Sequence, residues 1–168
     1  MSIYTRTGDD GSTYLYGGQR VPKSHPQMEV FGSLDELTSF VGLVVSKIEN
    51  QHYRQLLIDV QKDIYQIMSF LAENKKPKLN LQKRVDLFEE EINKIEKKLA
   101  KISGFILPGG TELSSWFHVL RVICRRAERN TVKFFSVKKL EIIRYLNRLS
   151  DFFFTLARYH SKDKEKTL

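Results

Sequence analysis

TELSSWFHVLRVICRRAERNTVKFF, residues 111–135, is the segment from which the architecture of this chain can be inferred first. Its apolar residues recur at alternating spacings of four and three, the pattern of one face of an amphipathic α-helix. A helix with one apolar face is stable only when that face packs against other elements. This segment therefore predicts a core-facing seam made of Leu113, Phe117, Leu120, Cys124, Ala127, Thr131 and Phe134.

A polar stripe lies beside this seam, because a helix turns by about 100° per residue. The stripe contains His118, Arg121, Arg125 and Glu128, whereas Arg126 points away from both seam and stripe. A half-buried arginine needs an anion, and one glutamate does not balance two arginines. Acidic side chains of other helices can supply that charge, with the arginine stems lying along the apolar surface, or a ligand can supply it.

Outward from this segment, the apolar pattern predicts five helices, over residues 27–48, 51–74, 80–101, 111–136 and 138–161. Pro77 separates the second from the third, and SGFILPGG, residues 103–110, separates the third from the fourth. We therefore expect one all-α domain over residues 1–168. It consists of a glycine-rich loop (1–26) with a short hairpin through STYLYGG, a five-helix bundle (27–161) and a solvated tail (162–168).

Two other predicted helices carry polar residues on one face. In the first helix, Asp35 shares a face with Gly32, Ser39 and Gly42, so a neighbouring helix can approach closely and Asp35 is expected to point inward, toward Arg121 or Arg125. In the fifth, Asn147, Asp151, Phe154 and Arg158 lie within about 40° of one another. A purely structural network of ion pairs explains both patterns as well as a ligand site does.

TRTGDDGST, residues 5–13, is rich in glycine and hydroxyl groups, and Lys23 follows it on the same loop. Converging backbone N–H groups in such a loop can bind phosphate. The segment matches neither G-x-x-x-x-G-K-[ST] nor G-x-G-x-x-G, so a simple surface turn is the alternative. Asp9 and Asp10 offer carboxylates to a divalent metal, which would need further oxygen ligands.

Composition narrows the function classes. The 168 residues carry a formal net charge of +8, which favours anionic partners. No apolar run approaches the roughly 18 residues of a membrane span, and no signal peptide is visible at the first residues. The single cysteine, Cys124, excludes an internal disulfide, is expected to be a core residue, and favours a reducing, cytoplasmic location. His25 and His118 have no second ligand at a metal-binding spacing.

A helical nucleic-acid-binding module is one alternative, based on the basic run RVICRRAERNTVK, residues 121–133. The arginines of this run lie beside the core seam, and no helix-turn-helix spacing is present. We therefore expect no nucleic acid and no membrane among the partners.

Four segments together carry a family resemblance: YTRTGDDGST (4–13), VFGSLDEL (30–37), FILPGGTELSSWFHVLRVICRRAERN (105–130) and YLNRLSDFFFTLARY (145–159). In this order they resemble the signature blocks of ATP:cob(I)alamin adenosyltransferases of the PduO type. The resemblance implies a five-helix bundle, a homotrimer with active sites between subunits, and transfer of the 5′-deoxyadenosyl group of ATP to cob(I)alamin with release of triphosphate. A non-catalytic relative that binds ATP or a corrinoid as a sensor or carrier is the second alternative.

The resemblance also implies roles for individual residues. Phe105 would cover the lower face of the corrin, Asp35 and Arg121 would form a salt bridge between subunits at the corrin site, and Arg125 would bind the triphosphate. Mg²⁺ and an electron-donating reductase are implied, without identified metal ligands. Trp116 stands where a small residue is common, which would reshape the corrin side. The implied ATP-binding residues are Thr5, Arg6, Thr7, Gly8, Thr13, Lys23, Arg125, Arg126, Glu128, Arg129 and Asn147.

Overall fold

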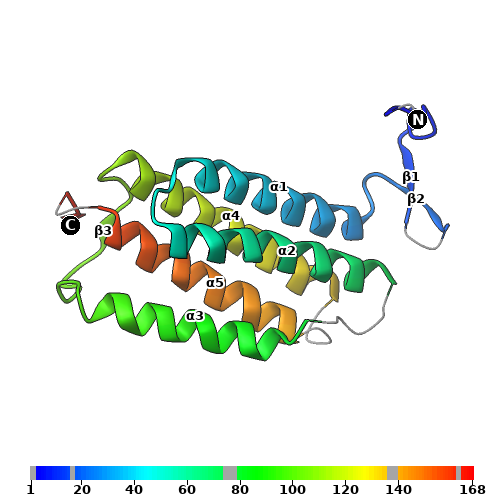
Figure 1. The fold of residues 1–168 in the computed structure, drawn as a ribbon. Coiled ribbons are helices and arrows are strands. Elements are labelled where there is room, and N and C mark those ends of the chain that lie inside the picture. Colours follow the sequence, from blue (N-terminus) through cyan, green and yellow to red (C-terminus); the bar gives the residue numbers. More distant parts are fainter. Residues whose placement is uncertain (1–2, 16–17, 74–78, 136–139, 162–163) are drawn as a thin grey trace.

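The computed structural model describes residues 3–15, 18–73, 79–135, 140–161 and 164–168. Five long helices run alongside one another (Figure 1). This confirms the predicted all-α bundle. The helices are α1 (Pro26–Lys47), α2 (Gln51–Glu73), α3 (Leu81–Glu96), α4 (Glu112–Phe135) and α5 (Leu140–Tyr159).

The helix boundaries agree with the predicted ones, with one clear exception. The third helix was expected to reach residue 101, but α3 ends at Glu96. Its last turn tightens, because the N–H groups of Lys98 and Leu99 bond to carbonyls only three residues back, those of Ile95 and Glu96. The predicted helix ends at residues 74, 136 and 138, and the break at Pro77, lie outside the described residues.

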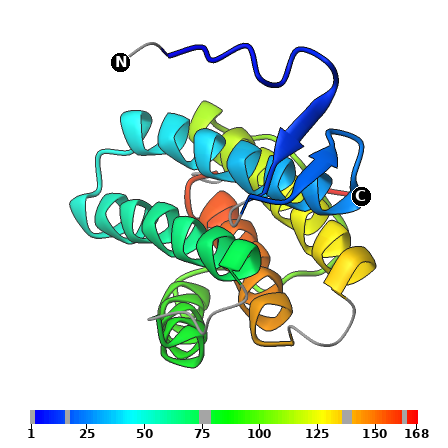
Figure 2. The ribbon, with the colours of Figure 1, turned by 90° about the vertical axis from the view of Figure 1, so that its right-hand side faces the viewer.

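Helix α4 occupies the middle of the bundle. It packs against α1 on one side and α5 on the other, while α2 packs on α1 and α3 packs on α5 (Figure 2). The predicted seam is confirmed. Phe117, Leu120, Cys124, Ala127 and Thr131 are buried, and Leu113 and Phe134 pack against the core at its two ends. The polar edge of α4 is therefore fixed in direction by a well-packed apolar face.

Short strands stand at both ends of the bundle. β1 (Ser12–Tyr14) pairs antiparallel with β2 (Arg20–Pro22), which confirms the hairpin, and this unit projects beyond the first turn of α1 (Figure 1). At the opposite end, β3 (Ile106–Leu107) pairs antiparallel with β4 (Lys166–Thr167). The described part of the expected solvated tail is exposed apart from the half-buried Glu165, but it is ordered, because Lys166 and Thr167 pair with the loop before α4.

A buried ion pair joins three of the helices. The Asp63 side chain on α2 is 2% exposed. It accepts hydrogen bonds from Arg84 Nε of α3 at 2.7 Å, from Arg84 Nη2 at 3.0 Å and from the Tyr145 hydroxyl of α5 at 3.1 Å. Burial raises the pKa of Asp63, while the hydrogen bonds from Arg84 oppose this rise. The charge on Asp63 therefore depends on Arg84.

Replacing Arg84 with methionine is expected to lower the free energy of unfolding by about 3 kcal/mol, because it leaves a buried carboxylate without its cation. A carboxyl group whose pKa is raised in the folded state destabilises the folded protein as the pH rises above its pKa in the unfolded chain. The loss of unfolding free energy in Arg84→Met should therefore grow from about pH 4 upward. Urea unfolding at several pH values measures both effects. The double variant Arg84→Met with Asp63→Leu should recover most of the loss. Equal stability of Arg84→Met and the unmodified protein would contradict this role.

Candidate functional site

The N-terminal loop folds back on itself around Gly8. A Cβ built on Gly8 would lie 3.3 Å from Lys23 Nζ, so the lysine side chain reaches over this glycine. The Lys23 N–H donates to the Gly11 carbonyl at 2.8 Å, and the hydroxyls of Thr5 and Thr7 are 2.9 Å apart. The structure thus brings the predicted hydroxyls, glycine and lysine of this loop together, whereas Thr13 lies next to them within β1.

Two further groups of this loop have unusual surroundings. Arg6 has φ 61°, the left-handed region that residues other than glycine rarely adopt, and its guanidinium lies 5.5 Å from the centre of the Tyr4 ring. Such conformations concentrate at binding sites. Asp10 is engaged by Arg20 and by Ser12, whose hydrogen bonds lower its pKa. The Asp9 side chain makes no hydrogen bond or ion pair within the described residues.

The second group of predicted residues lies on neighbouring faces of α4 and α5. Asn147 Nδ2 donates to Glu128 Oε1 at 3.2 Å, so these two side chains meet in the structure. Arg125 and Arg129 are exposed, and Arg126 forms an ion pair with Glu36 of α1, in agreement with its predicted outward direction. No hydrogen bond or ion pair among the described residues joins this group to the N-terminal loop.

The third group surrounds a cavity of about 350 Å³ at the start of α4, lined by Ile102, Gly104, Phe105, Ile106, Pro108, His118, Arg121 and Phe154. Phe105 is 85% exposed, an unusual position for so apolar a side chain. The polar residues of this lining are His118, which is buried, and Arg121, which is half-buried.

Two buried nitrogen atoms beside this cavity, His118 Nδ1 and Arg121 Nε, have no hydrogen-bond partner within the described part of the chain. Burial lowers the pKa of His118, and the neighbouring Arg121 lowers it further. Burial lowers the pKa of Arg121 as well, followed by the effect of Arg125. A buried polar nitrogen without a partner is costly, so this cavity is suited to a ligand or a second chain that offers an acceptor to Arg121 Nε and a polar group to His118 Nδ1.

The expectation for Asp35 is wrong within one chain. Asp35, Gly32 and Ser39 are exposed, and Asp35 makes no ion pair with Arg121 or Arg125. The neighbouring face of α1, which carries Val30, Leu34, Leu37, Val41 and Val44, is the buried one. The helical wheel placed the small residues together correctly, but this face of α1 is turned away from the core.

The predicted polar face of α5 separates into three different contacts. Asn147 bonds to Glu128, and Asp151 accepts from Arg148 at 2.7 Å. Arg158 is 7% exposed and binds Glu165, with Nε to Oε1 at 3.0 Å. The partner of Arg158 was not predicted, because Glu165 lies in the segment 162–168, which was expected to be solvated. The only signal was a buried-face arginine followed seven residues later by a glutamate.

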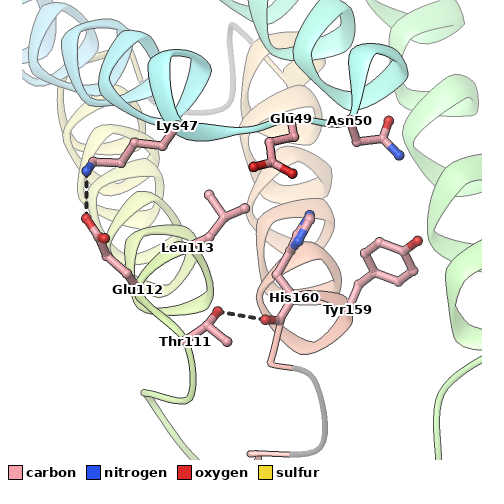
Figure 3. A pocket seen from close by; sticks show the side chains of 8 residues that line it. All are labelled: Lys47, Glu49, Asn50, Thr111, Glu112, Leu113, Tyr159 and His160. Atoms are coloured by element: carbon pink, nitrogen blue, oxygen red, sulfur yellow. Dashed lines mark hydrogen bonds and ion pairs between the residues drawn. The ribbon is translucent and has the colours of Figure 1, made fainter.

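A cavity of about 630 Å³, larger than the Phe105 cavity, lies elsewhere, where α1 ends and α4 begins (Figure 3). Lys47 and Glu112 form an ion pair of 2.6 Å at its edge, and Thr111 donates to the His160 carbonyl at 2.7 Å. Trp116 lies one turn further along α4, donates to Glu112 and packs on Phe40. None of the predicted substrate residues lines this cavity, and Trp116 does not line the Phe105 cavity.

Cys124 is buried, as expected, and burial raises the pKa of its thiol well above the usual range. Within the described ranges, no group of three or more His, Cys, Asp or Glu side chains is arranged to hold a metal ion. None of the described helices is long and apolar enough to cross a membrane.

Comparisons with known proteins match this arrangement as a whole. Residues 3–160 match the family model described as cobalamin adenosyltransferase. The chain is 39% identical to a corrinoid adenosyltransferase PduO of Citrobacter freundii over 97% of its length, and 36% identical to a Bacillus subtilis corrinoid adenosyltransferase, of which it covers 86%. It spans about half, 51%, of the Citrobacter relative.

A solved structure is similar throughout. It is a variant of a PduO-type ATP:corrinoid adenosyltransferase from Lactobacillus reuteri, complexed with cobalamin and ATP. The match has a TM-score of 0.90 and 33% sequence identity, and it covers 99% of this chain and 98% of that one. The similarity therefore includes the N-terminal loop and the segment after α5 as well as the five helices.

Proposed function

This chain belongs to the cobalamin adenosyltransferase family, and from this premise we propose that it transfers the 5′-deoxyadenosyl group of ATP to cob(I)alamin and releases triphosphate. The observation that carries the proposal is the Phe105 cavity, which is lined by an exposed aromatic ring and by two residues whose buried nitrogens, His118 Nδ1 and the donor Arg121 Nε, have no partner inside the described chain. A corrin ring offers a large apolar face together with amide acceptors at its edge, which suits both features.

The proposed reaction is a nucleophilic substitution. An electron pair of Co(I) forms the bond to the 5′ carbon of ATP, the bond from this carbon to the ester oxygen breaks, and triphosphate leaves with that bonding pair. Negative charge therefore grows on the leaving oxygen. Lys23 and the backbone N–H groups around Gly8 on one side, and Arg125 on the other, are suited to stabilise it. Cobalt supplies the electrons, so no protein base is required.

The proposed task of Phe105 is to keep the lower face of cobalt free of ligands. Co(II) in cobalamin carries a lower axial ligand, whereas Co(I) carries none, so removing that ligand favours reduction. An apolar ring at this face excludes both water and the nucleotide base. The reductase that supplies the electron would then act on a corrinoid already held by this chain.

The site is proposed to be shared between copies of the chain. The N-terminal loop and β3, which follows Phe105, lie at opposite ends of the bundle (Figure 1), separated by α4. A helix of 24 residues is about 36 Å long, far more than one ATP can bridge. The exposed Asp35 and the unpartnered Arg121 Nε would meet across such an interface.

Sedimentation at micromolar concentration tests this arrangement. We expect a homotrimer, three times the 19.7 kDa of one chain. The variant Asp35→Ala should weaken the assembly or its corrin site, whereas Glu96→Ala, an exposed carboxylate at the end of α3, should not. A protein that is monomeric and fully active would contradict a shared site.

Mg²⁺ is proposed to bind together with ATP, mainly through the phosphates, and not in a site formed by protein side chains alone. Magnesium commonly keeps several waters and is held by substrate phosphates with one or two carboxylates. The described residues fit that mode, because Asp9 has a free carboxylate on the phosphate-binding loop while Asp10 is engaged by Arg20. When bound, the ion would neutralise phosphate charge.

An anaerobic assay with ATP, Mg²⁺ and chemically reduced cob(I)alamin tests the proposed function. We expect the Co(I) absorbance to disappear and adenosylcobalamin to form, with catalytic turnover. ATP and corrinoid binding without turnover would support the sensor or carrier alternative and overturn the enzyme. The same samples, titrated with DNA and RNA, test the nucleic-acid alternative, for which we expect no saturable binding.

A further inference from the structure

The segment after α5 is fastened beside Phe105 by three contacts. Glu165 accepts from the buried Arg158, Nε to Oε1, at 3.0 Å. Lys166 and Thr167 pair with Leu107 and Ile106 as β4 and β3. The Leu168 N–H donates to the Phe105 carbonyl at 2.9 Å. We call Lys164–Leu168 the strap; it holds the Phe105 loop by its backbone and by one buried ion pair.

The strap carries two lysines on the side that Glu165 does not use. Lys164 and Lys166 line a cavity of about 510 Å³ together with Leu107, Pro108, Gly109 and Gly110. This lining contains no acidic side chain, and the neighbouring Glu165 is committed to Arg158. Neither lysine has an ion pair within the described residues. Because two cationic side chains and no acidic one line this cavity, an anion bound there would be attracted by both lysines.

This cavity adjoins the Phe105 cavity, because Pro108 lines both. Gly109 and Gly110 present backbone without side chains, and the space beside Gly109 is open, because a Cβ built there would meet no atom within 4 Å, whereas one built on Gly110 would lie 3.3 Å from Ser161 Cβ. An anionic group attached to a corrin that rests on Phe105 would therefore reach the two lysines without crossing the core.

We propose that Lys164 and Lys166 form an anion subsite for the phosphodiester of the corrinoid's nucleotide tail. This inference rests on the proposed function. When Phe105 takes the lower face of the corrin, the nucleotide base has to leave cobalt, and its tail, which carries one negative phosphodiester, must lie somewhere beside the ring. The strap places the cations at that position. The subsite binds complete corrinoids in preference to those without a nucleotide.

The triphosphate of ATP is the other phosphate source in this reaction. The predicted ATP loop lies at the opposite end of the bundle from the strap in one chain (Figure 1). The experiment separates the two sources by using a corrinoid pair that differs only in the tail: cobalamin, and cobinamide, which keeps the corrin ring and lacks the phosphodiester and nucleotide.

The test compares the unmodified protein with the double variant Lys164→Gln, Lys166→Gln. Equilibrium binding of cob(II)alamin and of cob(II)inamide in the presence of ATP is followed by the spectrum of cobalt, together with the dissociation constant for ATP. The double variant should bind cob(II)alamin about fivefold more weakly, as expected for exposed charge pairs. Its affinities for cob(II)inamide and ATP should be unchanged. The cobalamin effect should fade at high salt.

The matched control is Lys62→Gln with Lys83→Gln, which removes the same charge from exposed positions on α2 and α3. It should leave all three affinities unchanged. Equal weakening of both corrinoids by the strap variant, a loss confined to ATP, or no effect at all would overturn the subsite while leaving the proposed function intact. Failure of the unmodified protein to bind either corrinoid would overturn both.

Discussion

Replacing Arg125 with alanine is expected to slow adenosyl transfer about 100- to 1,000-fold, the size of effect seen when one fixed donor to a developing anion is removed. Arg125 is exposed on α4, beside the contact between Glu128 and Asn147, and makes no hydrogen bond or ion pair within the described chain. Its guanidinium is therefore available to the leaving triphosphate. Single-turnover rates with saturating ATP and cob(I)alamin measure the effect.

Two controls make this result specific. Arg54→Ala removes another exposed arginine, on α2, and should leave the rate unchanged. Because Arg125 is exposed, the free energy of unfolding of Arg125→Ala should lie within about 0.5 kcal/mol of that of the unmodified protein. Arg125→Lys keeps the charge without the planar fork and should fall between the two rates. A single-turnover rate of Arg125→Ala equal to that of the unmodified protein would remove Arg125 from the reaction.

Replacing Phe105 with alanine is expected to slow product formation about 100-fold when the assay starts from cob(II)alamin and a reductant. This factor corresponds to an activation barrier higher by roughly 2.7 kcal/mol. The smaller side chain would admit water or the nucleotide base beneath cobalt, which opposes formation of Co(I). Starting from cob(I)alamin prepared in advance, the same variant should lose far less. The ratio of the two rates is the measurement.

The Phe105 ring is 85% exposed and contributes little to the core, so its removal should change the reaction without unfolding the protein. Phe105→Leu keeps an apolar group at the same place and should preserve much of the cob(II)alamin-dependent rate. Tyr65→Ala removes another exposed aromatic ring, on α2, and should have no effect on either rate. An equal loss from both starting corrinoids would show that Phe105 binds the ring without controlling its lower ligand.

The fold could be predicted from the sequence where apolar periodicity is long and regular. The α4 seam from Leu113 to Phe134 is confirmed, and so is the hairpin at STYLYGG. Apolar periodicity predicts which face of a helix is buried but not where its last turn lies. For this reason the third helix was predicted to reach residue 101, whereas α3 ends at Glu96. That end is set by three-residue backbone bonds that no side-chain pattern reports.

The site was predicted less completely, for two physical reasons. A helical wheel places Asp35 with its neighbours but cannot tell which side of α1 the other helices occupy, so an exposed residue was expected to be inward. The strap depends on a contact between Arg158 and Glu165 across a turn, and no periodic pattern reveals such a pair. The family resemblance pointed to residues that no periodic pattern singles out. In the structure Phe105 lines a cavity, and Glu128 and Asn147 are hydrogen-bonded to each other.

The most direct measurement of the central claim is a count of both products from one reaction. ATP and chemically prepared cob(I)alamin are mixed anaerobically with the protein, phosphorus NMR identifies the phosphate product, and absorbance counts adenosylcobalamin. We expect one triphosphate for each adenosylcobalamin, over many turnovers per chain. ADP and phosphate as products, or tight binding of both substrates without any carbon–cobalt bond, would contradict it.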